Sequence, residues 1–169
     1  MIAQFCLMFA LPALLAVAAA YDLATFTIPN LLSLVLAVAF AVFGFAIGLT
    51  PAGFSFHLLA GLIALVVGFA LFAFGYIGGG DAKLFAAVAL WLGLRDLLAY
   101  ALAASLLGGL LTLALLALRQ WPLPASLARR DWILKLHEKN SGIPYGVALA
   151  SGALLILPHT EILHLAASV

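Results

Sequence analysis

Charged residues and cysteine are both scarce in this sequence. Asp, Glu, Lys and Arg together make up 8% of the 169 residues, whereas a soluble domain carries about a quarter. The single cysteine, Cys6, excludes an internal disulfide and a cysteine-rich zinc site. A formal net charge of +1 gives no indication of a nucleic-acid partner. Hydrophobic residues make up 67%, more than a small soluble fold can hide from water. The surroundings of the chain are therefore expected to be lipid.

The apolar runs are continuous rather than alternating, which favours membrane helices over a membrane β-barrel. We expect an all-α membrane protein, a polytopic bundle of about six transmembrane helices forming a single domain over residues 1–169. No Lys or Arg precedes Lys83, so the first run lacks the positive region of a signal peptide and is expected to remain as a span. The expected spans cover residues 2–21, 31–49, 56–77, 82–94, 97–118 and 143–157.

The basic residues predict the orientation of these spans. With six spans, the loops at about 22–30, 78–83 and 119–142 share one side of the membrane, and they hold six of the seven Lys and Arg residues. The positive-inside rule makes that side cytoplasmic, with both termini outside. Within the longest loop, residues 127–139 are expected to form an amphipathic helix on the membrane surface.

Two of the six acidic residues, Asp22 and Asp81, stand at the ends of expected spans on the cytoplasmic side. Carboxylates at membrane depth are costly and indicate function. Two adjacent carboxyl groups share a proton, so that one acts as a base toward water while the other polarises a carbonyl. Helix dipoles favour Asp22 as the proton holder and Asp81 as the base. Taken alone, however, the local pattern favours Asp81 as the capping residue of an ordinary helix turn.

The residues around Asp81 are unusual in this apolar sequence. Gly78, Gly79 and Gly80 lack Cβ atoms, which would let an extended peptide approach the backbone beside Asp81. Lys83 either orients a carboxylate or serves as a cytoplasmic charge that sets topology. The four histidines are scattered and are expected to be interfacial or solvated; no metal site and no cofactor are expected.

The segment Gly78-Gly79-Gly80-Asp81-Ala82-Lys83 resembles the GxGDxK signature of the type IV prepilin peptidases, which are membrane aspartic proteases. Two further elements, in the same order as in that family, extend the resemblance over nearly the whole chain. Asp22 with the downstream Pro29-Asn30 resembles the first catalytic Asp and its Pro-Asn pair, and Pro144-Tyr145-Gly146 resembles a Pro-aromatic-Gly element of the last span.

This resemblance implies a multi-pass protein of the bacterial inner membrane that removes the leader peptide from prepilin precursors at the cytoplasmic face. Asp22 and Asp81 would be the catalytic pair. The chain looks most like the short, peptidase-only enzymes of tight-adherence (Flp-type) pilus systems. It lacks the paired CxxC loop of larger members, so zinc binding and N-methyltransferase activity are not expected. The alternatives are a small proton-coupled transporter and a non-catalytic membrane protein of pilus or secretion assembly.

Overall fold

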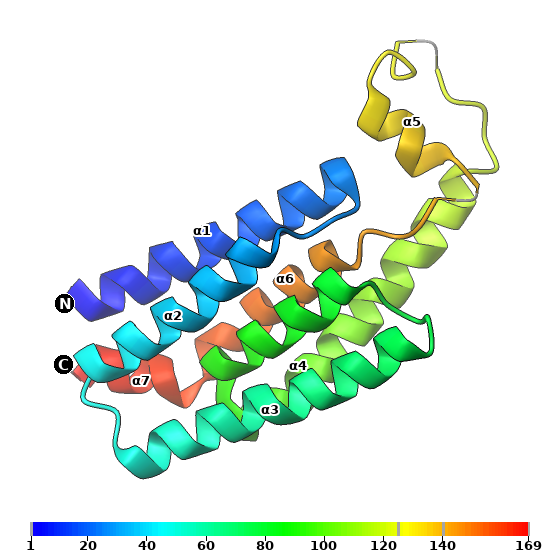
Figure 1. Ribbon diagram of the computed structural model, residues 1–169. Helices are drawn as coiled ribbons and strands as arrows, with labels where there is room; N and C mark the ends of the chain where they lie inside the picture. Colours follow the sequence, from blue (N-terminus) through cyan, green and yellow to red (C-terminus); the bar gives the residue numbers. More distant parts are fainter. Residues whose placement is uncertain (1, 125, 140, 169) are drawn as a thin grey trace.

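A computed structural model describes residues 2–124, 126–139 and 141–168, and these form helices and turns without a β-strand (Figure 1). Side chains are described from residue 9 to residue 166, so that of Cys6 lies outside the described part. The expected all-α fold is confirmed. The helices are α1 (Ile2–Thr25), α2 (Asn30–Ala46), α3 (Pro51–Ala73), α4 (Gly79–Leu118), α5 (Asp131–His137), α6 (Tyr145–Ile156), the 3₁₀ turn η1 (Leu157–His159) and α7 (Glu161–Ser168).

Helix α1 is longer than its apolar run. We expected it to end at Tyr21, but the Asp22 carbonyl still accepts the N–H of Phe26 at 2.7 Å, so helical bonding continues through Thr25. The helix then stops at Phe26, whose φ of 59° lies in the left-handed region. Asp22 therefore belongs to the last turn of α1 rather than to a polar loop, and its side chain is held by a regular helix.

Helix α3 begins earlier than its apolar run. We expected residues 50–53 to form a turn and the helix to start near Phe56, but α3 starts at Pro51. The Thr50 hydroxyl accepts the Gly53 N–H at 3.1 Å. Proline at the first helical position loses no hydrogen bond there, and threonine is a favoured capping residue. Thr50 and Pro51 therefore form the N-terminal cap and the first residue of α3.

Helix α4 is interrupted at Gly93, where the expected fourth and fifth spans meet. Gly93 has φ 79° and ψ 175°, a backbone conformation that costs residues other than glycine free energy. The chain reverses at this break. The reversal brings the rings of Phe85 and Tyr100, one from each half of the helix, into a stacked contact with centroids 5.3 Å apart. The reversal returns the second half of α4 to the end of the bundle where Asp81 lies (Figure 1).

Small residues bring the neighbouring helices close to α4. A Cβ on Gly68 of α3 would lie 3.1 Å from the Ala82 Cα, and one on Gly152 of α6 would lie 3.0 Å from the Ala104 nitrogen. Close approach at such positions is typical of packed membrane helices. Gly48 has a different role, because it follows α2 in a left-handed turn with open space beside it.

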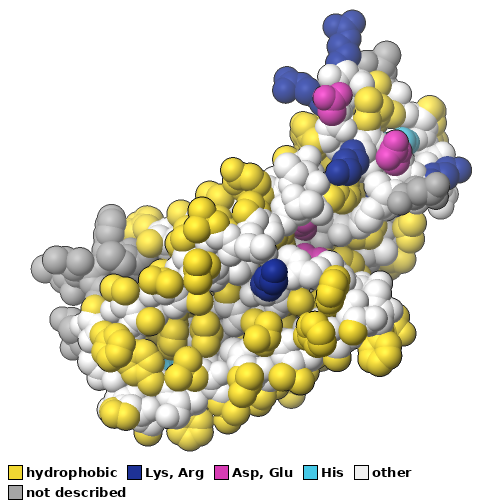
Figure 2. Space-filling view, in the orientation of Figure 1, with side chains coloured by type: hydrophobic (Ala, Val, Ile, Leu, Met, Phe, Trp, Pro, Cys, Tyr) yellow, Lys and Arg dark blue, Asp and Glu magenta, His cyan; other side chains and the backbone are white. Residues whose placement is uncertain are grey.

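The surface of the bundle is apolar over most of its length. Helices α3 and α4 are long and apolar enough to cross a membrane. Large side chains are left bare, including Phe45 (76% exposed) and Leu106 (74%). In Figure 2 hydrophobic side chains cover the body of the bundle, while charged side chains gather over the α5 segment. This surface is that of a membrane protein; the number of spans stays a prediction.

A helix forms within the expected range 127–139 but is shorter than expected, and its position on the membrane surface stays a prediction. Helix α5 covers Asp131–His137 rather than residues 127–139. It lies at the end of the bundle where the turns after α1 and α3 are found, and α7 lies at the opposite end (Figure 1). The three loops that we expected on one side of the membrane therefore lie at one end of the bundle.

Candidate active site

Asp22 is buried at the end of α1, with only 4% of its surface exposed. Its Oδ2 accepts the backbone N–H of Gly146 at 2.6 Å. Gly146 is in the first turn of α6, where backbone N–H groups have no partner within the helix. A Cβ at position 146 would lie 2.8 Å from that same oxygen. The glycine is therefore required for the contact, and α6 fixes the position of the Asp22 carboxyl group.

Asp81 is the third residue of α4 and is 9% exposed. Its Oδ2 accepts the Gly78 N–H at 3.0 Å, so the residue does cap its helix. Its Oδ1 is buried and has no hydrogen-bond partner among the described residues. Buried polar atoms are nearly always paired, and an exception needs a reason. Capping therefore accounts for only one of the two oxygens.

The two carboxyl groups line one cavity, although they are far apart in sequence. The cavity has a volume of about 270 Å³ and opens beside the glycine run. Its lining consists of Asp22, Phe26, Thr27, Ile28, Asn30, Gly78, Gly79, Gly80 and Asp81. The structure thus brings both expected carboxylates, the three glycines and Asn30 together. Among the described residues, no group of three or more His, Cys, Asp or Glu side chains could hold a metal ion.

Two of the three glycines have a packing reason for lacking a side chain. A Cβ on Gly80 would lie 3.1 Å from the Ile28 Cβ and 3.3 Å from its backbone nitrogen. A Cβ on Gly78 would lie 2.9 Å from Asp81 Oδ2. The glycines therefore let the loop after α1 close onto the start of α4. That close approach is what places Asp22 and Asp81 in the same cavity.

The other predicted site residues surround the cavity without lining it. Lys83 donates to Asn30 Oδ1 at 2.7 Å, which ties α4 to the start of α2. Pro29 immediately precedes α2 with φ −59°, and so places Asn30 as its first residue. Pro144 immediately precedes α6, and Tyr145 is its first residue. Pro144 is fully buried, and a Cβ on Gly108 would lie 2.6 Å from the Tyr145 ring.

Sequence reasoning missed the role of Arg119, which it counted only as a cytoplasmic charge. Arg119 is 7% exposed, and its guanidinium donates to the carbonyls of Leu136 and Gly142 and to the Ser141 hydroxyl, at 2.8, 3.0 and 2.8 Å. The guanidinium also donates to the Ser141 carbonyl at 3.3 Å, so its planar fork holds four acceptors. The position of Arg119, directly after a long apolar run, was the signal that could have revealed its buried role.

Lys135 of α5 is a second missed contact near the site. It donates to the Thr25 carbonyl at 3.1 Å and lies 4.9 Å from the ring centroid of Phe26, which lines the cavity. Because Arg119 binds the carbonyl of the adjacent Leu136, the basic segment is folded back onto the end of α1. The segment is therefore packed against Phe26, next to the cavity, and is not a free loop. None of its residues lines the cavity.

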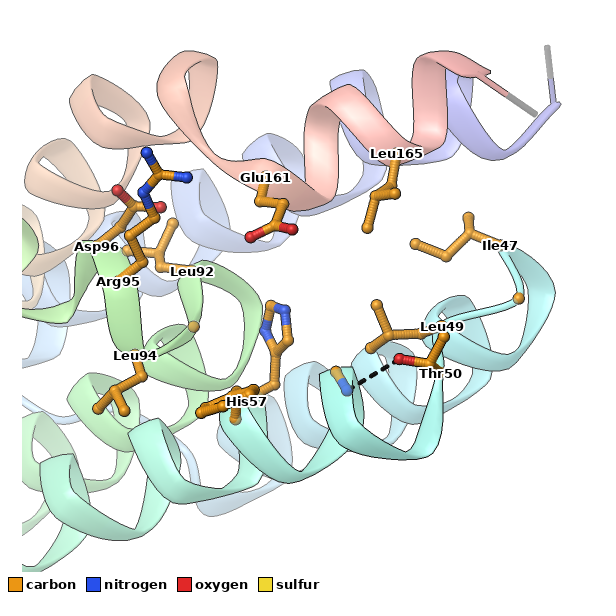
Figure 3. A pocket seen from close by; sticks show the side chains of 14 residues that line it. Ile47, Leu49, Thr50, His57, Leu92, Leu94, Arg95, Asp96, Glu161 and Leu165 are labelled. Carbon is orange, nitrogen blue, oxygen red and sulfur yellow. Dashed lines mark hydrogen bonds between the residues drawn. The ribbon is translucent and has the colours of Figure 1, made fainter.

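A larger cavity of about 560 Å³ lies between the α2–α3 turn and α7 and is lined by charged groups that include Arg95, Asp96 and Glu161 (Figure 3). His57 and Glu161 point toward each other across it. We expected interfacial or solvated histidines, but His57 is only 8% exposed, and its Nδ1 bonds to the Leu90 carbonyl at 2.7 Å. The break at Gly93 frees that carbonyl from the helix, so His57 replaces a lost backbone partner.

Comparison with known proteins gives one match. Residues 9–113 match the profile of the type IV leader peptidase family. The matched range includes Asp22, Asn30, the glycine run, Asp81 and Lys83, and it ends before Gly146. No curated protein and no solved structure shows significant similarity to the chain.

Proposed function

The chain belongs to the type IV leader peptidase family, and we propose that it cuts the leader from prepilin or prepilin-like precursors with Asp22, Asp81 and a water molecule. The observation that carries the proposal is that two buried carboxyl groups from separate helices line one cavity. Cleavage takes place at the cytoplasmic face of the bacterial inner membrane, within a single membrane-embedded domain of six spans. The basic loops at the Asp22 end of the bundle support this orientation.

The hydrogen bonds restrict where a shared proton can reside. Asp22 Oδ2 and Asp81 Oδ2 accept the N–H groups of Gly146 and Gly78, and these bonds favour the ionised form of those two oxygens. They leave the Oδ1 atoms as the favoured positions for a shared proton, and Asp81 Oδ1 has no other partner among the described residues. The Gly146 bond also stabilises a charged Asp22, which opposes the helix-dipole argument for Asp22 as the proton holder.

In the reaction, the ionised carboxyl takes a proton from water, and the resulting hydroxide attacks the carbonyl carbon of the scissile peptide. The protonated carboxyl gives its proton to the carbonyl oxygen. Collapse of the tetrahedral intermediate breaks the C–N bond, and the amine leaves with a proton from the first carboxyl. One hydroxyl of the intermediate returns its proton to the second carboxyl, which forms the product acid and restores the starting pair. The chemistry needs no metal or cofactor. The glycines and Asn30 are positioned to contact the peptide, and Lys83 orients Asn30.

The test is co-expression of the full chain with a pilin precursor, followed by mass measurement of the precursor in the membrane fraction. Asp22→Asn and Asp81→Asn are each expected to lower the cleavage rate by at least about 100-fold, the usual contribution of a positioned acid or base. Asp96→Asn is the matched control, because Asp96 is a partly buried carboxylate of the larger cavity. It is expected to cut at the wild-type rate.

The same assay separates the alternatives. A transporter or an assembly protein would leave the precursor uncut by the wild-type chain, and that result would refute the proposal if the protein is folded in the membrane. Retained cleavage in both Asp variants would refute the catalytic pair while keeping the peptidase. Cleavage that persists with a chelator is expected. A mass increase from N-methylation of the product is not expected, as for a short tight-adherence-type peptidase.

A further inference from the structure

Asp81 faces a second cavity on its other side, at the junction of α3, α4 and α6. This cavity has a volume of about 210 Å³. It is lined by Val67, Leu71, Ile77, Asp81, Phe85, Ala101, Ala104, Ser105, Tyr145 and Leu149. The reversal of α4 at Gly93 creates it, since Asp81 and Phe85 come from the first half of that helix and Ala101 from the second. Asp81 therefore belongs to the walls of two cavities.

The two cavities differ in chemistry. The cavity shared with Asp22 presents carboxylates, Asn30, Thr27 and glycine backbone. The second presents mostly aliphatic and aromatic side chains, with Ser105 and Tyr145 as its uncharged polar residues. An apolar cavity of about 150 Å³ is large enough for a benzene ring, so the second cavity has room for one large apolar side chain. Asp81 thus lies on the boundary between a polar site and an apolar one.

An extended peptide advances about 3.3 Å per residue. A scissile bond held at Asp81 therefore has its two flanking residues within reach of both cavities. We propose that the second cavity binds the first large apolar side chain on the membrane-inserted side of the scissile bond, while the polar leader side lies along the glycine run. This proposal rests on the proposed peptidase function, and it assigns a specificity pocket to the same site.

Two residues of the cavity lining on α3 are also exposed on the surface of the bundle, Val67 at 46% and Leu71 at 38%, so we infer an opening on the apolar surface. That opening suits a substrate that is itself inserted in the membrane, because its apolar segment can enter sideways between α3 and the second half of α4. A lipid acyl chain is the competing occupant. It would use the same opening without any dependence on the precursor sequence, and this difference can be measured.

The experiment uses the full chain in membrane vesicles with two precursors that differ only in the first residue after the scissile bond, Phe or Ala. Ala101→Trp fills the cavity and is expected to lower the ratio of kcat/KM for Phe over Ala by at least about tenfold, the discrimination expected of an apolar pocket. Leu102→Trp is the matched control, since the neighbouring Leu102 does not line the cavity and is 56% exposed. It is expected to leave the ratio unchanged.

Leu71→Ala tests the opposite change, because it enlarges the same cavity. It is expected to shift the preference toward a precursor with Trp at the same position. An unchanged ratio in both Ala101→Trp and Leu71→Ala would overturn the pocket, as would an equal loss for both precursors in Ala101→Trp. Neither result would affect the proposed function, provided that the wild-type chain cuts the precursors. A wild-type chain that cuts none overturns the function, and the pocket with it.

Discussion

The two ends of the bundle each contain a cavity with carboxylates, but the carboxylates are held in different ways. At one end Asp22 and Asp81 are each fixed by a backbone N–H at the start of a helix. The other end has a cavity about twice as large, where Asp96 Oδ2, like Asp81 Oδ1, has no partner among the described residues. Cavity size and an unpartnered oxygen therefore do not distinguish the two ends. The backbone donors to Asp22 and Asp81 do, because they fix a carboxyl group without adding a competing side chain.

The two ends also differ in what their histidine and glycine residues do. Gly93 and His57 together stabilise the break in α4. Gly93 adopts a backbone conformation with positive φ, and the His57 imidazole bonds to the Leu90 carbonyl. Gly146 and Gly78 instead leave room for carboxylate oxygens. Substitutions at the first pair are expected to affect stability, and those at the second pair to affect the reaction. The following predictions use this contrast.

The largest effect is expected for Gly146→Ala. The added Cβ would lie 2.8 Å from Asp22 Oδ2 and equally close to Ile28 Cδ1, so the carboxyl group must move. A displacement of about 1 Å at a reacting group costs about 100-fold in rate, and we expect a loss of kcat of that order. The rate is measured by precursor cleavage, with the thermal unfolding of the variant followed in parallel.

Gly109→Ala is the control for that change, because nothing lies within 4 Å of a Cβ at position 109. In a helix interior, alanine is favoured over glycine by about 1 kcal/mol, so this variant is expected to be at least as stable as the wild type and fully active. Wild-type cleavage by Gly146→Ala would contradict the view that α6 positions Asp22.

An intermediate effect, on stability alone, is expected for Gly93→Ala. The residue has φ +79°, and a Cβ would lie 3.0 Å from the His57 ring. Strain of this kind costs about 1–3 kcal/mol, seen as a lower unfolding temperature in vesicles, while the cleavage rate per folded molecule is expected to stay the same. Gly75→Ala separates the two causes, since Gly75 has φ +77° and open space around it.

The smallest effect is expected for the contact between Lys83 and Asn30. Both side chains are exposed, and exposed contacts of this kind contribute less than about 1 kcal/mol. Lys83→Met, Asn30→Leu and the double variant form a cycle in which the single losses of cleavage rate are expected not to add. Loss of all cleavage in Lys83→Met but not in Asn30→Leu would show that the lysine acts on the substrate instead.

Much of the fold could be predicted from the apolar runs and the basic loops. These features extend over many residues, so an error of a few residues at a helix end does not change the predicted fold. The all-α class and the break between the fourth and fifth runs were predicted, and the structure confirms them. The ends of α1 and α3 were wrong, because Asp22 and Pro51 look like loop residues, whereas local hydrogen bonds include them in helices. Local bonding decided these boundaries, and hydropathy does not report it.

The candidate site was predictable as a set of residues but not as an arrangement. The motifs around Asp22, Asp81 and Gly146 were found separately, and the structure adds that Gly146 donates to Asp22. No pattern in the sequence encodes a contact between α1 and α6. The same holds for Arg119, whose acceptors are three carbonyl groups and one hydroxyl group of a polar segment that has little periodicity of its own.

The hydrogen bond between Asp22 and Gly146 has a consequence for the order of synthesis. These residues are separated by 124 positions. At a translation rate of about 5–20 residues per second, roughly 6 to 25 s pass between their emergence from the ribosome. During that interval Asp22, Asp81 and the whole family-matched range already exist without the N–H donor of α6. If the proposed function holds, the Asp22 carboxyl group receives this donor only after Gly146 has been made, and a product truncated before Gly146 is expected to be inactive.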